Sequence, residues 1–141
     1  MTTISVLPST DRGHAELHFA AGVPGFPLAK SFSVKPWGTE PTPFFILECH
    51  EVVGLRFVAV RPVAFFSWYE PHFGSEVFQA VDAGGPEDVL VLVILTLHGT
   101  VEKSTANLLG PLVVNNATGQ AVQAVLSGSG YSPAVPIVTR P

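Results

Sequence analysis

The stretch EDVLVLVILTL, residues 87–97, contains nine consecutive apolar or β-branched residues, from Val89 to Leu97. Extended as a β-strand, such a run is about 30 Å long, and both of its faces must be covered because side chains alternate between them. It is too short for a transmembrane helix, which needs about 20 apolar residues. The stretch therefore predicts a central strand of a sheet or barrel.

Shorter runs on both sides of this stretch predict further strands. In HAELHF, residues 14–19, polar and apolar side chains alternate, which is typical of a strand with one solvent-facing side. The 13 prolines and 13 glycines divide the rest of the chain into short pieces. We expect a single all-β domain over residues 1–141, built as a small, compact antiparallel β-barrel. The other expected strands lie at residues 31–34, 43–50, 54–62, 111–115 and 121–126, and the last two are joined by a turn containing Gly119.

One short helix is predicted in SEVFQAVDAGG, residues 75–85. Ser75 is expected to cap its first turn, and Gly84 is expected to end it in a left-handed conformation. Val77, Phe78 and Val81 form its apolar stripe.

The composition excludes several classes of function. The net charge is −4, from 11 acidic and 7 basic residues, and the basic residues are scattered. Direct nucleic-acid binding requires a cationic cluster, so it is not expected. The single cysteine excludes an internal disulfide, and the N-terminal sequence lacks the pattern of a signal peptide. We expect a cytoplasmic protein that neither enters a membrane nor requires a cofactor.

No arrangement of reactive residues predicts an enzyme. His14, Glu16 and His18 share one face of their strand and are the best candidates for metal ligands, but a metal site usually needs ligands from another element, so a solvated strand face explains them better. Cys49 and His50 are adjacent, so in a strand their side chains point to opposite faces and cannot act as a nucleophile and its base. No catalytic site and no metal site is therefore expected.

Two segments are candidates for binding another protein. The first, VAFFSWYEPHF at residues 63–73, carries Phe65, Phe66, Trp68 and Tyr69, more aromatic area than one strand face readily buries. These rings are expected either to anchor a partner or to plug the barrel.

The second segment is TANLLGPLVVN, residues 105–115, which has no charge and a Gly-Pro pair between two apolar runs. It predicts a corner leading into a strand. Thr105 and Asn107 are expected either to bond the backbone of the corner or to face a partner.

Several segments together resemble a known family. AGVPGF at residues 21–26, PFFILECHEVVGLRFVAVRP at residues 43–62 and EDVLVLVILTL resemble its G-I-P-G-F corner, its strand pair and its central strand. TANLLGPLVVN is the most specific match, to T-A-N-L-L-A-P-I-V-I-N, and GQAVQAVL and YSP follow in order at residues 119–126 and 131–133. On these residues the chain resembles the flagellar assembly factor FliW family.

The resemblance implies a compact antiparallel β-barrel that regulates without catalysing a reaction. It implies two protein partners, flagellin and the RNA-binding regulator CsrA. In the family, FliW suppresses mRNA binding by CsrA allosterically, and accumulating flagellin removes FliW and so frees CsrA. The alternatives are that this barrel binds a small ligand or a metal, with His14, Glu16 and His18 as its support, or that it associates with itself.

Overall fold

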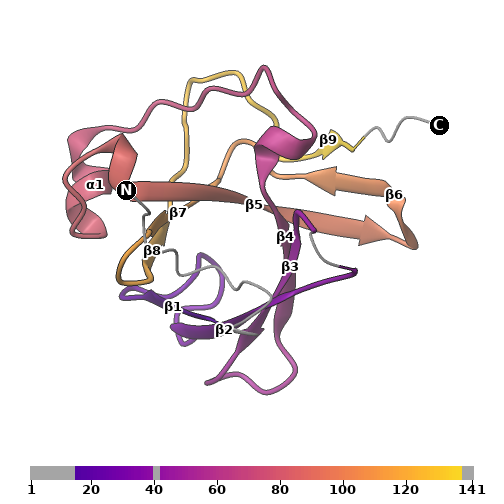
Figure 1. Cartoon of the computed structure of the whole chain (residues 1–141), viewed down its shortest axis with the longest axis horizontal. Coiled ribbons are helices and arrows are strands. Elements are labelled where there is room, and N and C mark those ends of the chain that lie inside the picture. The colour runs from indigo at the N-terminus through magenta and orange to yellow at the C-terminus, as the bar shows by residue number, and fades with distance from the viewer. Residues whose placement is uncertain (1–14, 40–41, 138–141) are drawn as a thin grey trace.

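The structure, a computed structural model, describes residues 15–39 and 42–137. Short strands dominate, as the proline and glycine spacing predicts, and they are joined into one continuous sheet (Figure 1). The strands are β1 (Ala15–Phe19), β2 (Ser31–Pro36), β3 (Phe44–Cys49), β4 (Arg56–Val60), β5 (Val89–His98), β6 (Thr100–Ala106), β7 (Leu112–Asn115), β8 (Gln120–Gln123) and β9 (Val135–Pro136). The described helices are α1 (Ser75–Ala80) and two 3₁₀ turns, η1 (Pro62–Ala64) and η2 (Pro86–Asp88).

Seven of the strands close into a barrel in the order β1-β2-β3-β4-β5-β7-β8, which confirms the predicted fold class. Six of the neighbouring pairs are antiparallel, but β1 and β8 run parallel, with His18 opposite Gln120 and Phe19 opposite Ala121. A ring with an odd number of strands cannot alternate in direction all the way round. One parallel pair is therefore required, and the barrel is antiparallel everywhere except at this closure.

Strand β5 holds the barrel together, as its long apolar run predicts. Its first half pairs with β7, its second half pairs with β6, and its middle, at Val93–Leu95, also pairs with β4. Leu92 and Val93 point to opposite faces of the strand and neither has any solvent exposure. The hairpin of β5 and β6 projects from the barrel on the side away from α1 (Figure 1).

The alternation of side chains along these strands creates two separate cores. The barrel interior is filled mainly by residues of β1, β2, β3, β5 and β7, including Leu17, Phe32, Leu47, Leu92 and Leu112. The second core lies on the outer surface of β4 and β5, where Val60, Val93 and Leu95 pack against residues from outside the barrel. Cys49 is buried in the barrel interior.

Two details of the predicted helix are wrong. The N-cap is Gly74, not Ser75, and no side chain caps the first turn. After the helix the left-handed residue is Asp82, with φ of 56°, and not Gly84. Asn115 supports this unusual turn, because its amide donates to the carbonyls of Val81 and Asp82 at 2.9 and 3.1 Å.

One further expected feature is present, and two strands, β6 and the two-residue β9, were not predicted. The hairpin of β7 and β8 turns through Gly119, whose φ is 85°. Strand β6, TVEKSTA, was not predicted, because its largely exposed polar side chains show no apolar alternation. No helix within residues 15–39 and 42–137 is long and apolar enough to cross a membrane.

Candidate partner-binding surface

The aromatic segment after β4 covers the outside of the barrel and does not plug its interior. Pro62 ends β4 and begins η1, and the chain then turns back so that Phe66 and Tyr69 enter the second core beside Val60 and Val93. The rings contact one another in sequence: Phe65 and Phe66 lie 6.5 Å apart between centroids, and Phe66 and Trp68 lie 5.7 Å apart. Contacts of this kind add to the free energy gained from burying the rings.

The four aromatic residues differ sharply in exposure. Phe66 and Tyr69 are only 4% and 8% exposed, and Phe65 is partly buried. Trp68 is 59% exposed, although one face of its ring stacks on Tyr131 at 6.4 Å. Of the four, Trp68 is the ring that a partner can reach directly, and Phe66 and Tyr69 hold it in place through ring contacts.

The two predicted segments meet at a buried hydrogen bond. The hydroxyl of Tyr69 donates to the carbonyl of Leu108 at 2.7 Å, so the aromatic segment is tied to the corner in TANLLGPLVVN. Burial, and to a lesser extent the nearby Tyr131, raises the pKa of Tyr69 well above its ordinary value of 10.0. The hydroxyl therefore remains a donor at neutral pH.

Thr105 and Asn107 lie on either side of Ala106 in this corner and both are partly buried. The side-chain oxygen of Asn107 accepts a hydrogen bond from the N–H of Gly110 at 2.9 Å, which closes the turn before Pro111. Thr105 pairs with Thr96 of β5 and with Pro136 of β9. Asn107 therefore has a structural task in the turn, and neither residue presents as much free surface as Trp68.

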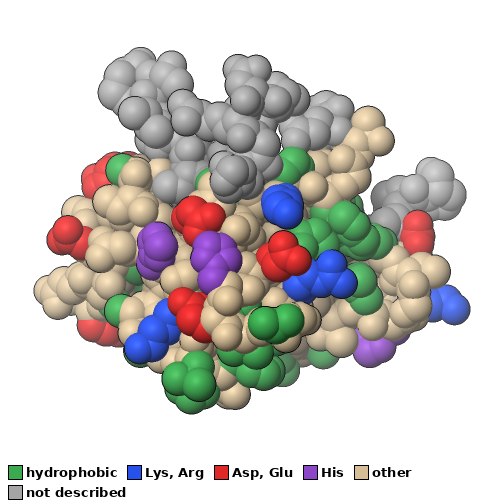
Figure 2. Space-filling model, turned by 90° about the horizontal axis from the view of Figure 1, so that it is seen from below, with side chains coloured by type: hydrophobic (Ala, Val, Ile, Leu, Met, Phe, Trp, Pro, Cys, Tyr) green, Lys and Arg blue, Asp and Glu red, His purple; other side chains and the backbone are tan. Residues whose placement is uncertain are grey.

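The face predicted as a possible metal site carries a polar network. Glu16 and His50 are 3.4 Å apart, and the Ser33 hydroxyl contacts both, at 3.1 and 2.7 Å. Among residues 15–39 and 42–137 no three His, Cys, Asp or Glu side chains are grouped so that they could hold a metal ion. His14 lies outside the described residues. Figure 2, viewed from the side of β1 and β2, shows acidic, basic and histidine side chains interspersed on this surface.

The carboxylate of Glu51 anchors the start of β2. It accepts hydrogen bonds from the backbone N–H groups of Ser31 and Lys30, at 2.9 and 3.1 Å. The bond from Ser31 is the main reason that the pKa of Glu51 falls to about 2. This carboxylate is structural, because its acceptor oxygen is already occupied by backbone donors.

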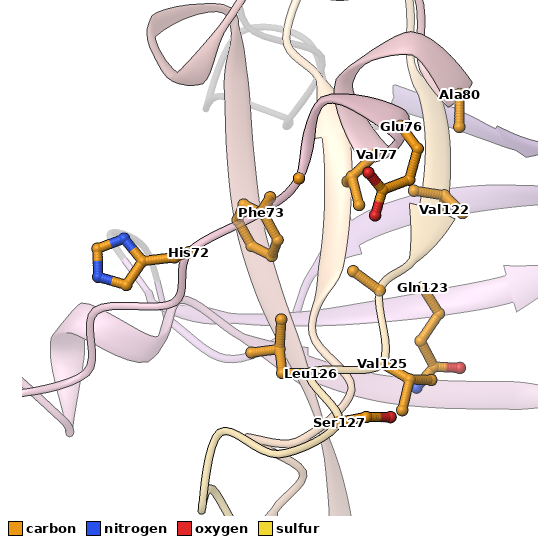
Figure 3. A pocket seen from close by; sticks show the side chains of 12 residues that line it. His72, Phe73, Glu76, Val77, Ala80, Val122, Gln123, Val125, Leu126 and Ser127 are labelled. Carbon is orange, nitrogen blue, oxygen red and sulfur yellow. The ribbon is translucent and has the colours of Figure 1, made fainter.

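A groove that the sequence did not predict runs beside the aromatic segment. One hollow, with a volume of about 460 Å³, lies between α1 and the end of β8, and a second, of about 340 Å³, continues from it toward Tyr131. The two share His72, Leu126 and Ser127. In Figure 3, Phe73 and Val77 line one wall, while Val122, Val125 and Leu126 line the other. The only sign of this groove in the sequence was the apolar stretch AVQAVL, residues 121–126, which extends beyond the end of β8 at Gln123.

A family profile described as "FliW protein" matches residues 5–137. The chain belongs to the FliW family. The flagellar assembly factor FliW of Bacillus subtilis (strain 168) is 39% identical over 119 residues, which are 84% of this chain and 82% of that protein. The corresponding factor of Bacillus pumilus (strain SAFR-032) is 36% identical over 115 residues, 82% of this chain and 79% of that protein.

The fold agrees with a solved FliW structure. A crystal structure of a flagellar assembly factor FliW aligns with a TM-score of 0.78 and 26% identity, over 99% of each chain. The FliW resemblance seen in the sequence motifs is therefore confirmed both for the chain and for its barrel. The relatives are named as assembly factors, which places this chain in a family of flagellar assembly proteins.

Proposed function

We propose that this FliW-family protein is a non-enzymatic, chaperone-like cytoplasmic regulator that binds flagellin and a CsrA-type RNA-binding regulator. The observation that carries the proposal is family membership over most of the chain, with relatives named as flagellar assembly factors. Regulation by exchange of partners needs only protein surfaces. It requires no catalytic group, no cofactor and no direct contact with nucleic acid.

The exposed Trp68 supports the proposal, because it has the properties of an interface anchor. Tryptophan is enriched among the residues that dominate binding energy, and such anchors work best when their position is fixed before binding. Here Phe66 and Tyr69 pack beneath the segment, and Tyr131 stacks against the indole. We extend the proposed contact surface from Trp68 to the partly buried Phe65, Thr105 and Asn107, with Phe66 and Tyr69 as its buried support.

The proposed switch demands only a modest difference in affinity. A tenfold preference for one partner corresponds to about 1.4 kcal/mol, which a single well-placed aromatic side chain can provide. Flagellin can therefore displace the regulator without a large rearrangement of the barrel, provided that the two bound states exclude each other.

Isothermal titration calorimetry with the flagellin and the CsrA-type regulator of the same organism tests the proposal. We expect saturable binding of each partner, and weaker binding of each in the presence of the other. Absence of binding to both partners, by a protein shown to be folded, would refute it.

A further inference from the structure

The groove beside α1 is continuous with the surface around Trp68. Tyr131, on which Trp68 stacks, lines the second hollow together with Glu70 and His72. The first hollow then continues from His72 into the space between α1 and the end of β8 (Figure 3). An extended or helical segment lying along the groove would therefore reach Trp68 at one end.

The lining of the groove combines apolar area with negative charge. Val125 is 61% exposed, and Phe73, Val77 and Leu126 are partly exposed around it. Exposed apolar area gathered in a hollow is typical of a surface that another molecule covers.

The charged residues of the groove have one sign. Glu76 lies between the two walls of the first hollow (Figure 3), and Glu70 lines the second. Neither carboxylate forms an ion pair with any residue that the structure describes. No lysine or arginine lines either hollow, so within the described chain nothing neutralises the two carboxylates.

We propose that this groove is the docking surface for the CsrA-type regulator, and that it accepts a segment with apolar side chains and at least one lysine or arginine. The inference rests on the proposed function. Charge complementarity decides between the two partners, because a protein that binds RNA must carry clustered lysine and arginine to neutralise phosphates. The apolar side chains of the segment would cover Val125 and Leu126, and its cation would approach Glu76 or Glu70.

Two pairs of variants separate the groove from the rest of the surface. Glu70→Gln/Glu76→Gln removes both groove carboxylates, and Glu87→Gln/Glu102→Gln removes two exposed carboxylates elsewhere, so both variants change the net charge by the same amount. Val125→Ser removes exposed apolar area inside the groove, and its control Val53→Ser does so in the β3–β4 turn, where Val53 is 96% exposed. All four are measured by calorimetry against the purified regulator and, separately, against flagellin, after thermal unfolding has shown that each is folded.

We expect the groove carboxylate variant to bind the regulator about fivefold more weakly, because the variant removes the carboxylate that pairs with the cation of the docked segment. Val125→Ser should weaken it about fivefold through lost apolar contact. Both controls should bind within about twofold of wild type on the same scale.

Four outcomes overturn the inference. If the two carboxylate variants bind the regulator equally weakly, the cause is net charge in general and not the groove. If both groove variants bind the regulator as tightly as wild type, the regulator docks elsewhere and the proposed function is left intact. Groove variants that lose flagellin but keep the regulator would assign the groove to flagellin. If the wild-type protein binds neither partner, the proposed function fails and the inference fails with it.

Discussion

Replacing Tyr69 by phenylalanine removes the one side-chain hydrogen bond that joins the aromatic segment to the TANLL corner. The hydroxyl donates to the Leu108 carbonyl at 2.7 Å, and Leu108 is completely buried. The ring remains, so its contact with Tyr131, at 4.7 Å between centroids, is kept and no cavity forms. The expected loss is therefore that of the hydrogen bond alone.

The size of that loss follows from burial. A buried carbonyl left without its donor costs about 1–3 kcal/mol, because water cannot take the place of the hydroxyl. We expect Tyr69→Phe to lower the free energy of unfolding by about 2 kcal/mol. For a domain of this size, that corresponds to a fall in Tm of about 6 °C.

Urea unfolding followed by fluorescence measures this difference, and the neighbouring Tyr131 provides the control. Its hydroxyl accepts a hydrogen bond from the N–H of Glu70 at 3.2 Å in an exposed position, so Tyr131→Phe should cost less than about 0.5 kcal/mol. The account of a buried tie between the two segments is refuted if the two variants unfold at the same urea concentration.

The remaining predictions concern single side chains. Trp68→Ala should weaken partner binding by more than about tenfold in calorimetry while leaving the protein folded, because the indole is largely exposed; unchanged affinity would remove it from the interface. Asn107→Ala removes the acceptor for the Gly110 N–H and should cost about 1 kcal/mol in urea unfolding, and a folded variant that no longer binds partners would show the corner to be part of the interface. Asn115→Ala removes a buried side-chain amide whose nitrogen and oxygen form hydrogen bonds with four backbone groups. It should lower the free energy of unfolding by about 3 kcal/mol. A decrease below about 1 kcal/mol would contradict the role of Asn115 in supporting the turn after α1. Glu51→Gln should destabilise the protein near pH 6 and progressively less toward pH 3. The folded carboxylate has a pKa of about 2 against an ordinary value of 4.5, so its contribution to stability is present above about pH 4.5 and is lost as the pH falls. A destabilisation that does not change with pH would contradict this.

The barrel could be predicted from the sequence because its strands carry strong local signals. The apolar run of β5 requires cover on both faces, and the alternation in β1 identifies one inner face. The parallel pairing of β1 and β8 was not predicted, because alternation within each strand says nothing about strand direction. Strand β6 gave no such signal because little of it is buried.

The candidate partner-binding surface could be predicted only in part from the sequence. The number of aromatic residues at positions 65–69 indicated a special segment, but composition does not show which ring is buried. That depends on how η1 turns the chain, which places Phe66 and Tyr69 inward and Trp68 outward. The groove depends on the packing of α1 against β8, two elements far apart in the sequence, and no local pattern fixes their separation.

Fluorescence anisotropy of a labelled RNA bound to the CsrA-type regulator tests the central claim most directly. The account predicts that adding this protein in stoichiometric excess releases the RNA, and that subsequent addition of flagellin restores RNA binding. Anisotropy that stays at the RNA-bound value after the protein is added would contradict the claim that it is a regulator of the FliW type.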